Sequence, residues 1–61
     1  MENTGKIRIL QNNIVQWSNM QNDLFERCME GLITKEEYKA RSNKLYEYIN
    51  ETKKEIHELS L

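Results

Sequence analysis

The residues of this chain whose types could perform chemistry do not have the spacing of an active site. His57 is the only histidine and Cys28 the only cysteine among the 61 residues. Structural zinc sites take four Cys or His ligands, and the Glu-x-x-His spacing of di-metal helical bundles is missing around His57. A Gly-rich phosphate loop and a Ser/His/Asp set are also missing. The sequence therefore predicts a protein that is not an enzyme, without catalytic residues, metal, cofactor or small-molecule substrate.

The same residues have structural roles if the chain is helical. Cys28 falls on an apolar stripe with helical spacing, where a thiol acts as a small buried apolar group. His57 lies near a predicted helix C-terminus, where a partly cationic ring is favourable. Glu36 and Glu37 lie in a predicted first turn, where acids interact favourably with the helix dipole. These roles all depend on two helices, whose boundaries the sequence marks.

A turn near the middle of the chain is the sharpest local signal. The chain has no proline, and its two glycines are Gly5 and Gly31. Gly31 suits the left-handed residue that commonly follows a helix. Thr34 and Glu37 have the spacing of a capping box, in which each side chain bonds to the backbone N–H of the other residue. This pattern predicts that one helix ends before the turn and another begins directly after it.

Each half of the chain carries a stripe of residues at alternating steps of three and four, which keeps one face of a helix toward a partner helix. These stripes, here called the seams, are Ile7, Leu10, Ile14, Trp17, Gln21, Leu24 and Cys28, and Tyr38, Ser42, Leu45, Ile49, Thr52, Ile56 and Leu59. Folding the chain at the turn sets the seams against each other, with Trp17 opposite Ile49 and Leu24 opposite Ser42. The seams therefore predict a regular helix pair.

The predicted fold class is all-α, an antiparallel two-helix hairpin that resembles a coiled coil. A single domain covers residues 1–61, with one helix at about 5–30, a turn at 31–34 and a second helix at about 35–59. The helix–helix core is predicted to contain Ile7, Leu10, Ile14, Trp17, Leu24, Leu45, Ile49, Ile56 and Leu59. The alternative is one continuous helix in an intermolecular coiled coil. Gly31 followed by a capping box favours the hairpin.

A chain of this length is expected to need a partner. One small apolar core supplies no more than about 3–5 kcal/mol, and a single cysteine cannot form an internal disulfide. Apolar residues also lie outside the seams, with Val15, Phe25 and Met29 on one side and Ile9 and Met20 on the other. The uncharged segment 9–22 is the predicted contact face, because charged groups are depleted in interface cores. The partner is another protein or a second copy, which would give a homodimeric four-helix bundle.

Composition excludes several other classes of partner. The net charge is −1, with nine basic and ten acidic residues, and no basic stripe that would bind nucleic acid directly. The longest uncharged segment is too short and too polar to span a membrane. A basic n-region followed by an apolar h-region, as in a signal peptide, is missing. The sequence therefore predicts a cytoplasmic protein, in agreement with its single free cysteine.

The segment from Cys28 to Leu45, CMEGLITKEEYKARSNKL, resembles the tip of the coiled-coil arm of large serine recombinases. In that family a long helix ends in a Gly-Leu-Ile turn, followed by Ser/Thr-x-Glu-Glu-Tyr/Phe, an Arg, a Leu and a second heptad helix. The matching positions are Gly31, Leu32, Ile33, Thr34, Glu36, Glu37, Tyr38, Arg41 and Leu45. The resemblance implies an arm whose apolar tip contacts other proteins and helps decide which DNA sites pair.

This sequence does not contain the family's catalytic serine domain, DNA-binding domains or zinc cysteines. The resemblance therefore leaves two interpretations, an excised arm or a small phage or mobile-element regulator that acts on such an arm, or resembles it, in site-specific DNA recombination. The second is the prediction. Its function would be protein–protein interaction, with a large serine recombinase as the expected partner. The predicted partner-binding residues are Phe25, Met29, Leu32, Ile33 and Tyr38.

A second resemblance concerns small helical-hairpin phosphatases that act on phosphorylated response regulators of sporulation. Their Ser-x-x-Leu-Asp motif and Ile-Asn-Glu-like stretch partly match Ser42 to Tyr46 and Ile49 to Glu51. Tyr46 stands where the family has Asp, and a tyrosine is not an anionic ligand or base at neutral pH. A response-regulator phosphatase is therefore one alternative function. A self-assembling structural or regulatory hairpin is another.

Overall fold

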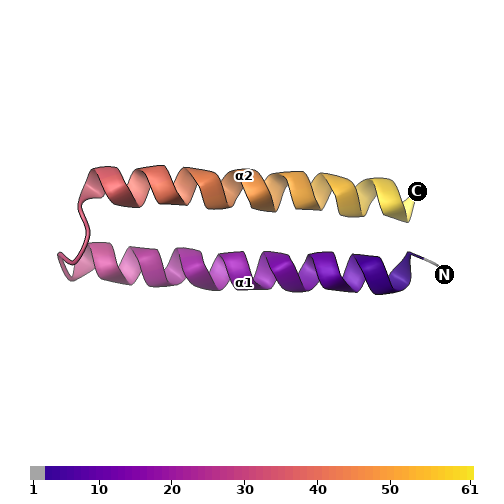
Figure 1. The fold of residues 1–61 in the computed structure, drawn as a ribbon, viewed down its shortest axis with the longest axis horizontal. Coiled ribbons are helices and arrows are strands. Elements are labelled where there is room, and N and C mark those ends of the chain that lie inside the picture. Colours follow the sequence, from indigo (N-terminus) through magenta and orange to yellow (C-terminus); the bar gives the residue numbers. More distant parts are fainter. Residues whose placement is uncertain (1–2) are drawn as a thin grey trace.

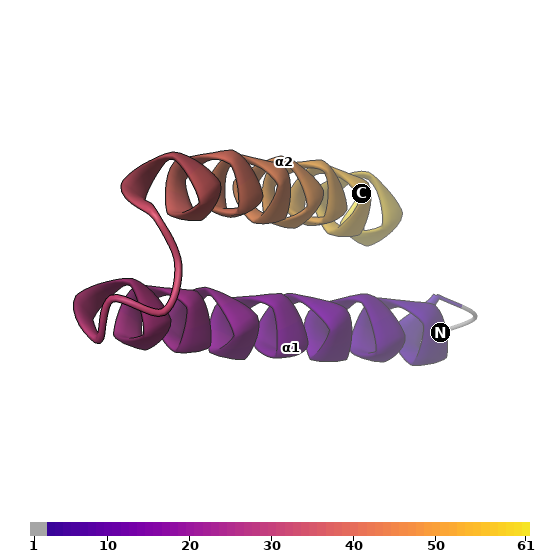
Figure 2. The ribbon, with the colours of Figure 1, turned by 60° about the vertical axis from the view of Figure 1, so that its left-hand side comes forward.

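The chain folds into two antiparallel helices of equal length. The computed structural model describes residues 3–61, in which α1, Thr4–Met29, is followed by α2, Lys35–Ser60, with 26 residues in each helix. The helices lie side by side, and both ends of the described chain lie opposite the turn (Figure 1 and Figure 2). The predicted all-α, two-helix hairpin is therefore confirmed.

The end of α1 is a Schellman motif built on Gly31. Its φ of 78° lies in the left-handed region that residues with a Cβ rarely adopt. The N–H of Gly31 donates to the carbonyl oxygen of Cys28 at 3.1 Å, and the N–H of Leu32 donates to that of Arg27 at 2.9 Å. Both bonds satisfy carbonyl groups that a helix end leaves without partners. The motif explains why α1 ends at Met29.

The start of α2 is a capping box formed by Thr34 and Glu37. The backbone of Thr34 is extended, with φ of −77° and ψ of 162°. Its Oγ1 accepts a hydrogen bond from the N–H of Glu37 at 3.0 Å, and Oε1 of Glu37 accepts one from the N–H of Thr34 at 3.4 Å. These reciprocal bonds satisfy two N–H groups at the helix start, so the capping residues fix where α2 begins.

The core between the helices is thin. Among residues 3–61 the buried apolar side chains are Leu24, Leu45 and Ile49, and no side chain is fully buried. Ser42 and Thr52 are also buried. The remaining seam residues are half-buried, namely Ile7, Leu10, Ile14, Trp17, Gln21, Cys28, Tyr38, Ile56 and Leu59. Two helices enclose only a single line of side chains, which leaves most of the core residues partly open.

A polar layer crosses the interface near the turn. Ser42 Oγ donates to Gln21 Oε1 at 2.9 Å, and Gln21 Nε2 donates to Tyr38 Oη at 3.1 Å. Further along the interface, the rings of Trp17 and Tyr48 pack at a centroid distance of 5.6 Å with an interplanar angle of 36°. Because a polar bond needs a particular partner, whereas apolar contacts are interchangeable, the polar layer favours one register of the two helices.

Candidate protein-binding surfaces

The residues predicted to bind a partner fall into two groups. Phe25, Met29 and Leu32 have exposed fractions of 53, 73 and 67%, and they lie at the turn end of the hairpin. We call these three the tip cluster. Ile33 and Tyr38 are half-buried. The ring of Tyr38 packs edge-to-face against Phe25 at a centroid distance of 6.3 Å, so the structure places Tyr38 as a support for the exposed cluster.

One edge of the hairpin continues from the tip cluster and carries mainly positive charge. Val15 lies two heptads from Met29 on the same side of α1, and Tyr46 flanks the seam of α2 at the matching edge. Both are exposed. The charged side chains at this edge are the exposed Arg8, Lys39 and Lys53 and, in the first turn of α2, Glu36. We call this surface the basic edge.

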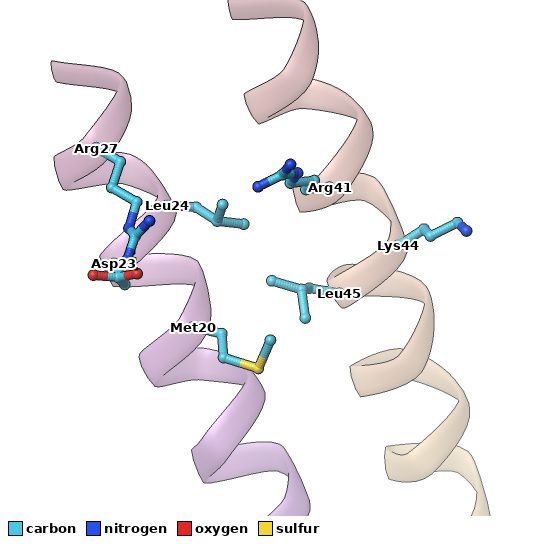
Figure 3. Close-up of a pocket in the computed structure, with 7 residues that line it drawn as sticks. All are labelled: Met20, Asp23, Leu24, Arg27, Arg41, Lys44 and Leu45. Atoms are coloured by element: carbon cyan, nitrogen blue, oxygen red, sulfur yellow. Dashed lines mark hydrogen bonds and ion pairs between the residues drawn. The ribbon is translucent and has the colours of Figure 1, made fainter. Parts of the chain in front are cut away.

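The other edge contains a shallow groove between the helices. Its volume is about 320 Å³, and its lining residues are Met20, Asp23, Leu24, Arg27, Arg41, Lys44 and Leu45. In Figure 3, Leu24 and Leu45 point toward each other across the interface, and Met20 lies beside them. The groove therefore has an apolar floor and a charged rim.

The charges at the rim of the groove are partly compensated. Arg27 Nε lies 2.9 Å from Asp23 Oδ2, and an Arg41 nitrogen lies 3.8 Å from a Glu37 carboxylate oxygen. No ion pair within 4.0 Å is found for Lys44 in the described part of the chain, and its side chain points away from α1 in Figure 3. All these side chains are exposed, so another molecule can reach them.

Residues with possible chemical roles stand apart from one another. Ser42 is buried and bonded to Gln21, Cys28 is half-buried on the seam, and His57 and Tyr46 are exposed on α2. Over residues 3–61, no three His, Cys, Asp or Glu side chains lie close enough to hold a metal ion together. The two edges of the hairpin therefore provide apolar and charged contact area for another molecule.

Sequence reasoning did not single out the groove as a binding feature. The sequence does contain a signal for it, because Met20 and Arg27 are seven residues apart, and Arg41 and Lys44 are three residues apart. Steps of three or seven residues place two side chains on the same side of a helix that faces a partner. These four residues flank the two seams and line the groove.

Comparison with protein-family models, curated proteins and solved structures finds no match to this chain. The resemblances to recombinase arms and to sporulation phosphatases therefore stay predictions. Within the described residues, neither α1 nor α2 has an apolar stretch of the kind that crosses a bilayer.

Proposed function

We propose that this chain is a non-enzymatic protein–protein interaction module that binds its partner through the tip cluster. The observation that carries the proposal is the joint exposure of Phe25, Met29 and Leu32 at one end of the hairpin. Three large apolar side chains exposed at the same end of a small protein favour a binding site, whereas single exposed apolar residues are ordinary. The thin core supports the same view, because a partner adds the apolar burial that two helices alone lack.

The charge of the basic edge indicates the chemistry of the partner. Arg8, Lys39 and Lys53 outnumber Glu36 on this surface, and Arg8 lies one heptad before the exposed Val15. A partner with an apolar patch bordered by Asp and Glu would complement this surface. Such complementarity mainly raises the association rate and excludes wrong partners, so salt should slow the association.

The partner class that the turn motif favours is a large serine recombinase, contacted on its coiled-coil arm. The support is the resemblance of the segment from Gly31 to Tyr38 to the tips of such arms. In this proposal the chain is a cytoplasmic regulator from a phage or mobile element. By occupying the arm tip it would change which DNA sites pair, and it would need no contact with DNA.

The direct test is binding of the purified chain to a large serine recombinase from the same genome. Leu32→Asp should abolish binding while helicity is retained, because Leu32 is exposed and lies outside both helices. The matched control is Leu61→Asp, which makes the same change at a residue that is 92% exposed at the opposite end. Binding that survives Leu32→Asp would overturn the tip assignment, and failure of the unmodified chain to bind would overturn the choice of partner.

A further inference from the structure

The edge that carries the groove has a self-complementary arrangement of charge along α2. Near the turn, Arg41 and Lys44 line the groove. Toward the other end of α2, Glu51 and Glu58 follow Lys44 at heptad steps, and Glu55 follows Arg41 at two heptads, so the same side of the helix becomes acidic. All of these side chains are exposed. Glu37, one heptad before Lys44, is the exception near the turn and pairs with Arg41 at 3.8 Å. On this side, α2 is therefore positive on balance near the turn and acidic toward its other end.

The part of α1 that lies on this edge is uncharged over its middle. Ile9, Gln16 and Met20 lie there with Asn13, which is half-buried although it is outside the seam. Charge appears on this side of α1 only toward its ends, as at Arg27. An apolar and amide-rich centre with charged ends is the composition of a protein interface, which has few charges in its core and many at its rim.

We infer that a second copy of this chain docks on the grooved edge, antiparallel to the first, to form a four-helix bundle with a tip at each end. The two-fold axis would lie across the hairpins, so that α1 packs on α1 and α2 on α2 of the copy. Such an isologous interface requires a surface that complements itself when reversed, and the charge order of α2 meets this requirement.

One register satisfies both charge and packing. Arg41 and Lys44 are three residues apart, as are Glu55 and Glu58. Antiparallel docking therefore places Lys44 opposite Glu55 and Arg41 opposite Glu58 of the copy, and the symmetry repeats both pairs. The exposed pairs contribute modestly to affinity but select the register and the partner.

The same register brings an apolar side chain to the groove. Ile9 of the copy arrives opposite Leu24, which with Leu45 forms the floor of the groove (Figure 3). Ile9 is exposed in the single hairpin, so docking would remove it from water. Lys6 of the copy approaches Arg27, whose charge is already compensated by Asp23 at 2.9 Å.

The exposed area agrees with a missing partner. The chain exposes 5108 Å², whereas a compact monomer of its mass exposes about 4200 Å². The excess of about 900 Å² is close to the roughly 800 Å² that each protein contributes to a standard interface. The Cα trace is 46 Å long and only 14 and 9 Å in its other dimensions, so the excess follows from the elongated shape, which offers a long face to a second copy.

The test measures solution mass by sedimentation equilibrium, without the partner proposed above. The unmodified chain at tens of micromolar should have twice the 7.4 kDa mass of one chain, and a monomer would overturn the inference. An acidic variant, Arg41→Glu with Lys44→Glu, and a basic variant, Glu55→Lys with Glu58→Lys, should each dimerise at least about tenfold more weakly, because like charges then meet at both ends.

Mixing the two variants keeps the test decisive if either one is poorly folded alone. An equimolar mixture should form a heterodimer of restored helicity, because every facing pair again has opposite charge. A mixture that stays monomeric overturns the assigned face. The control variant, Lys39→Glu with Lys53→Glu, has the same net charge as the acidic variant but changes the basic edge, and it should dimerise like the unmodified chain.

The orientation is tested by spin labels at the turn. A label on Leu32→Cys in a Cys28→Ser chain should report an intermolecular distance near the 46 Å length of the hairpin. Tips that lie side by side would instead give about 10–20 Å, one or two helix spacings, and that result would overturn the antiparallel arrangement. Because the recombinase is absent from these experiments, their failure is distinguishable from failure of the proposed tip function.

Discussion

Ser42 Oγ donates a 2.9 Å hydrogen bond to Gln21 Oε1, and this bond joins the two helices through a buried residue. The same Gln21 donates from its Nε2 to Tyr38 Oη, so one amide side chain satisfies two hydroxyl groups of α2. A hydroxyl that loses its partner in a buried place costs more free energy than the bond itself contributes. The Gln21–Ser42 pair is therefore the most sensitive polar contact of the hairpin.

We expect Gln21→Ala to lower the free energy of unfolding by about 1–3 kcal/mol, because it leaves the buried Ser42 hydroxyl without an acceptor. Removing both polar groups, by Gln21→Leu with Ser42→Ala, should restore most of that loss. Urea titrations followed by circular dichroism measure both values. The control is Gln11→Ala, the same change at an exposed position of α1. Equal losses for the single and double variants would contradict the buried bond.

Replacing each of the two glycines by alanine should change the stability of the hairpin in opposite directions. Gly31→Ala should destabilise the hairpin by about 1–2 kcal/mol, because an L residue at a φ of 78° is strained. An added Cβ meets no atom within 4 Å at either glycine, so steric overlap does not complicate the comparison. Gly5→Ala, inside α1, should instead stabilise by up to about 1 kcal/mol. Shifts of the same sign in the urea midpoint would contradict this account of the turn.

The capping box predicts a graded effect at Thr34. Thr34→Ala removes the acceptor of the Glu37 N–H bond at 3.0 Å and should cost about 1 kcal/mol. Thr34→Ser keeps the hydroxyl and should change stability by only a few tenths of a kcal/mol. Thermal unfolding of the two variants gives the comparison. An alanine variant as stable as the serine variant would show that the cap contributes nothing.

Alanine substitutions at Trp17 and Val15 compare a side chain in the helix interface with one on the exposed flank. Trp17 is half-buried and packs against Tyr48, so Trp17→Ala should remove about 2–4 kcal/mol, most of the stability available to so small a core. Val15 is 56% exposed, and Val15→Ala should change stability by less than about 0.5 kcal/mol. Far-ultraviolet circular dichroism at room temperature should show lost helicity for the first variant only.

The turn and the fold class were predictable because local chemistry decides them. Gly31, Thr34 and Glu37 act through bonds to their own backbone neighbours, so their types alone indicate where one helix ends and the next begins. The seams were predictable for a similar reason, since helical spacing decides which residues face the partner helix.

The side-chain pairs across the interface were less predictable. The ring of Trp17, predicted to lie opposite Ile49, packs against that of Tyr48. Ser42, predicted to lie opposite Leu24, bonds to Gln21, which also bonds to Tyr38. Long side chains reach adjacent layers, and their rotamers depend on packing that a one-dimensional pattern does not contain.

Surface ion pairs were likewise not fully predictable from the spacing of charged residues. Helical spacing of three or four residues predicts many ion pairs, and Arg41 and Glu37 form one at 3.8 Å. Lys54 and Glu58 have the same spacing, yet no ion pair between them is found in the described residues. Exposed pairs contribute only a few tenths of a kcal/mol, so competition with water decides which of them form.

Asn3 Nδ2 donates to the Leu59 carbonyl oxygen at 3.2 Å. This bond joins the start of α1 to the end of α2, at the end of the hairpin opposite Gly31. Because both ends of the described chain lie at the same end of the hairpin, the hairpin could be inserted into another protein. Inserted into a surface loop of another protein, the hairpin should disturb the backbone of that protein little. A group attached at the turn would then lie up to 46 Å, the length of the Cα trace, from the insertion site. The hairpin itself would then act as a rigid spacer between the host and that group.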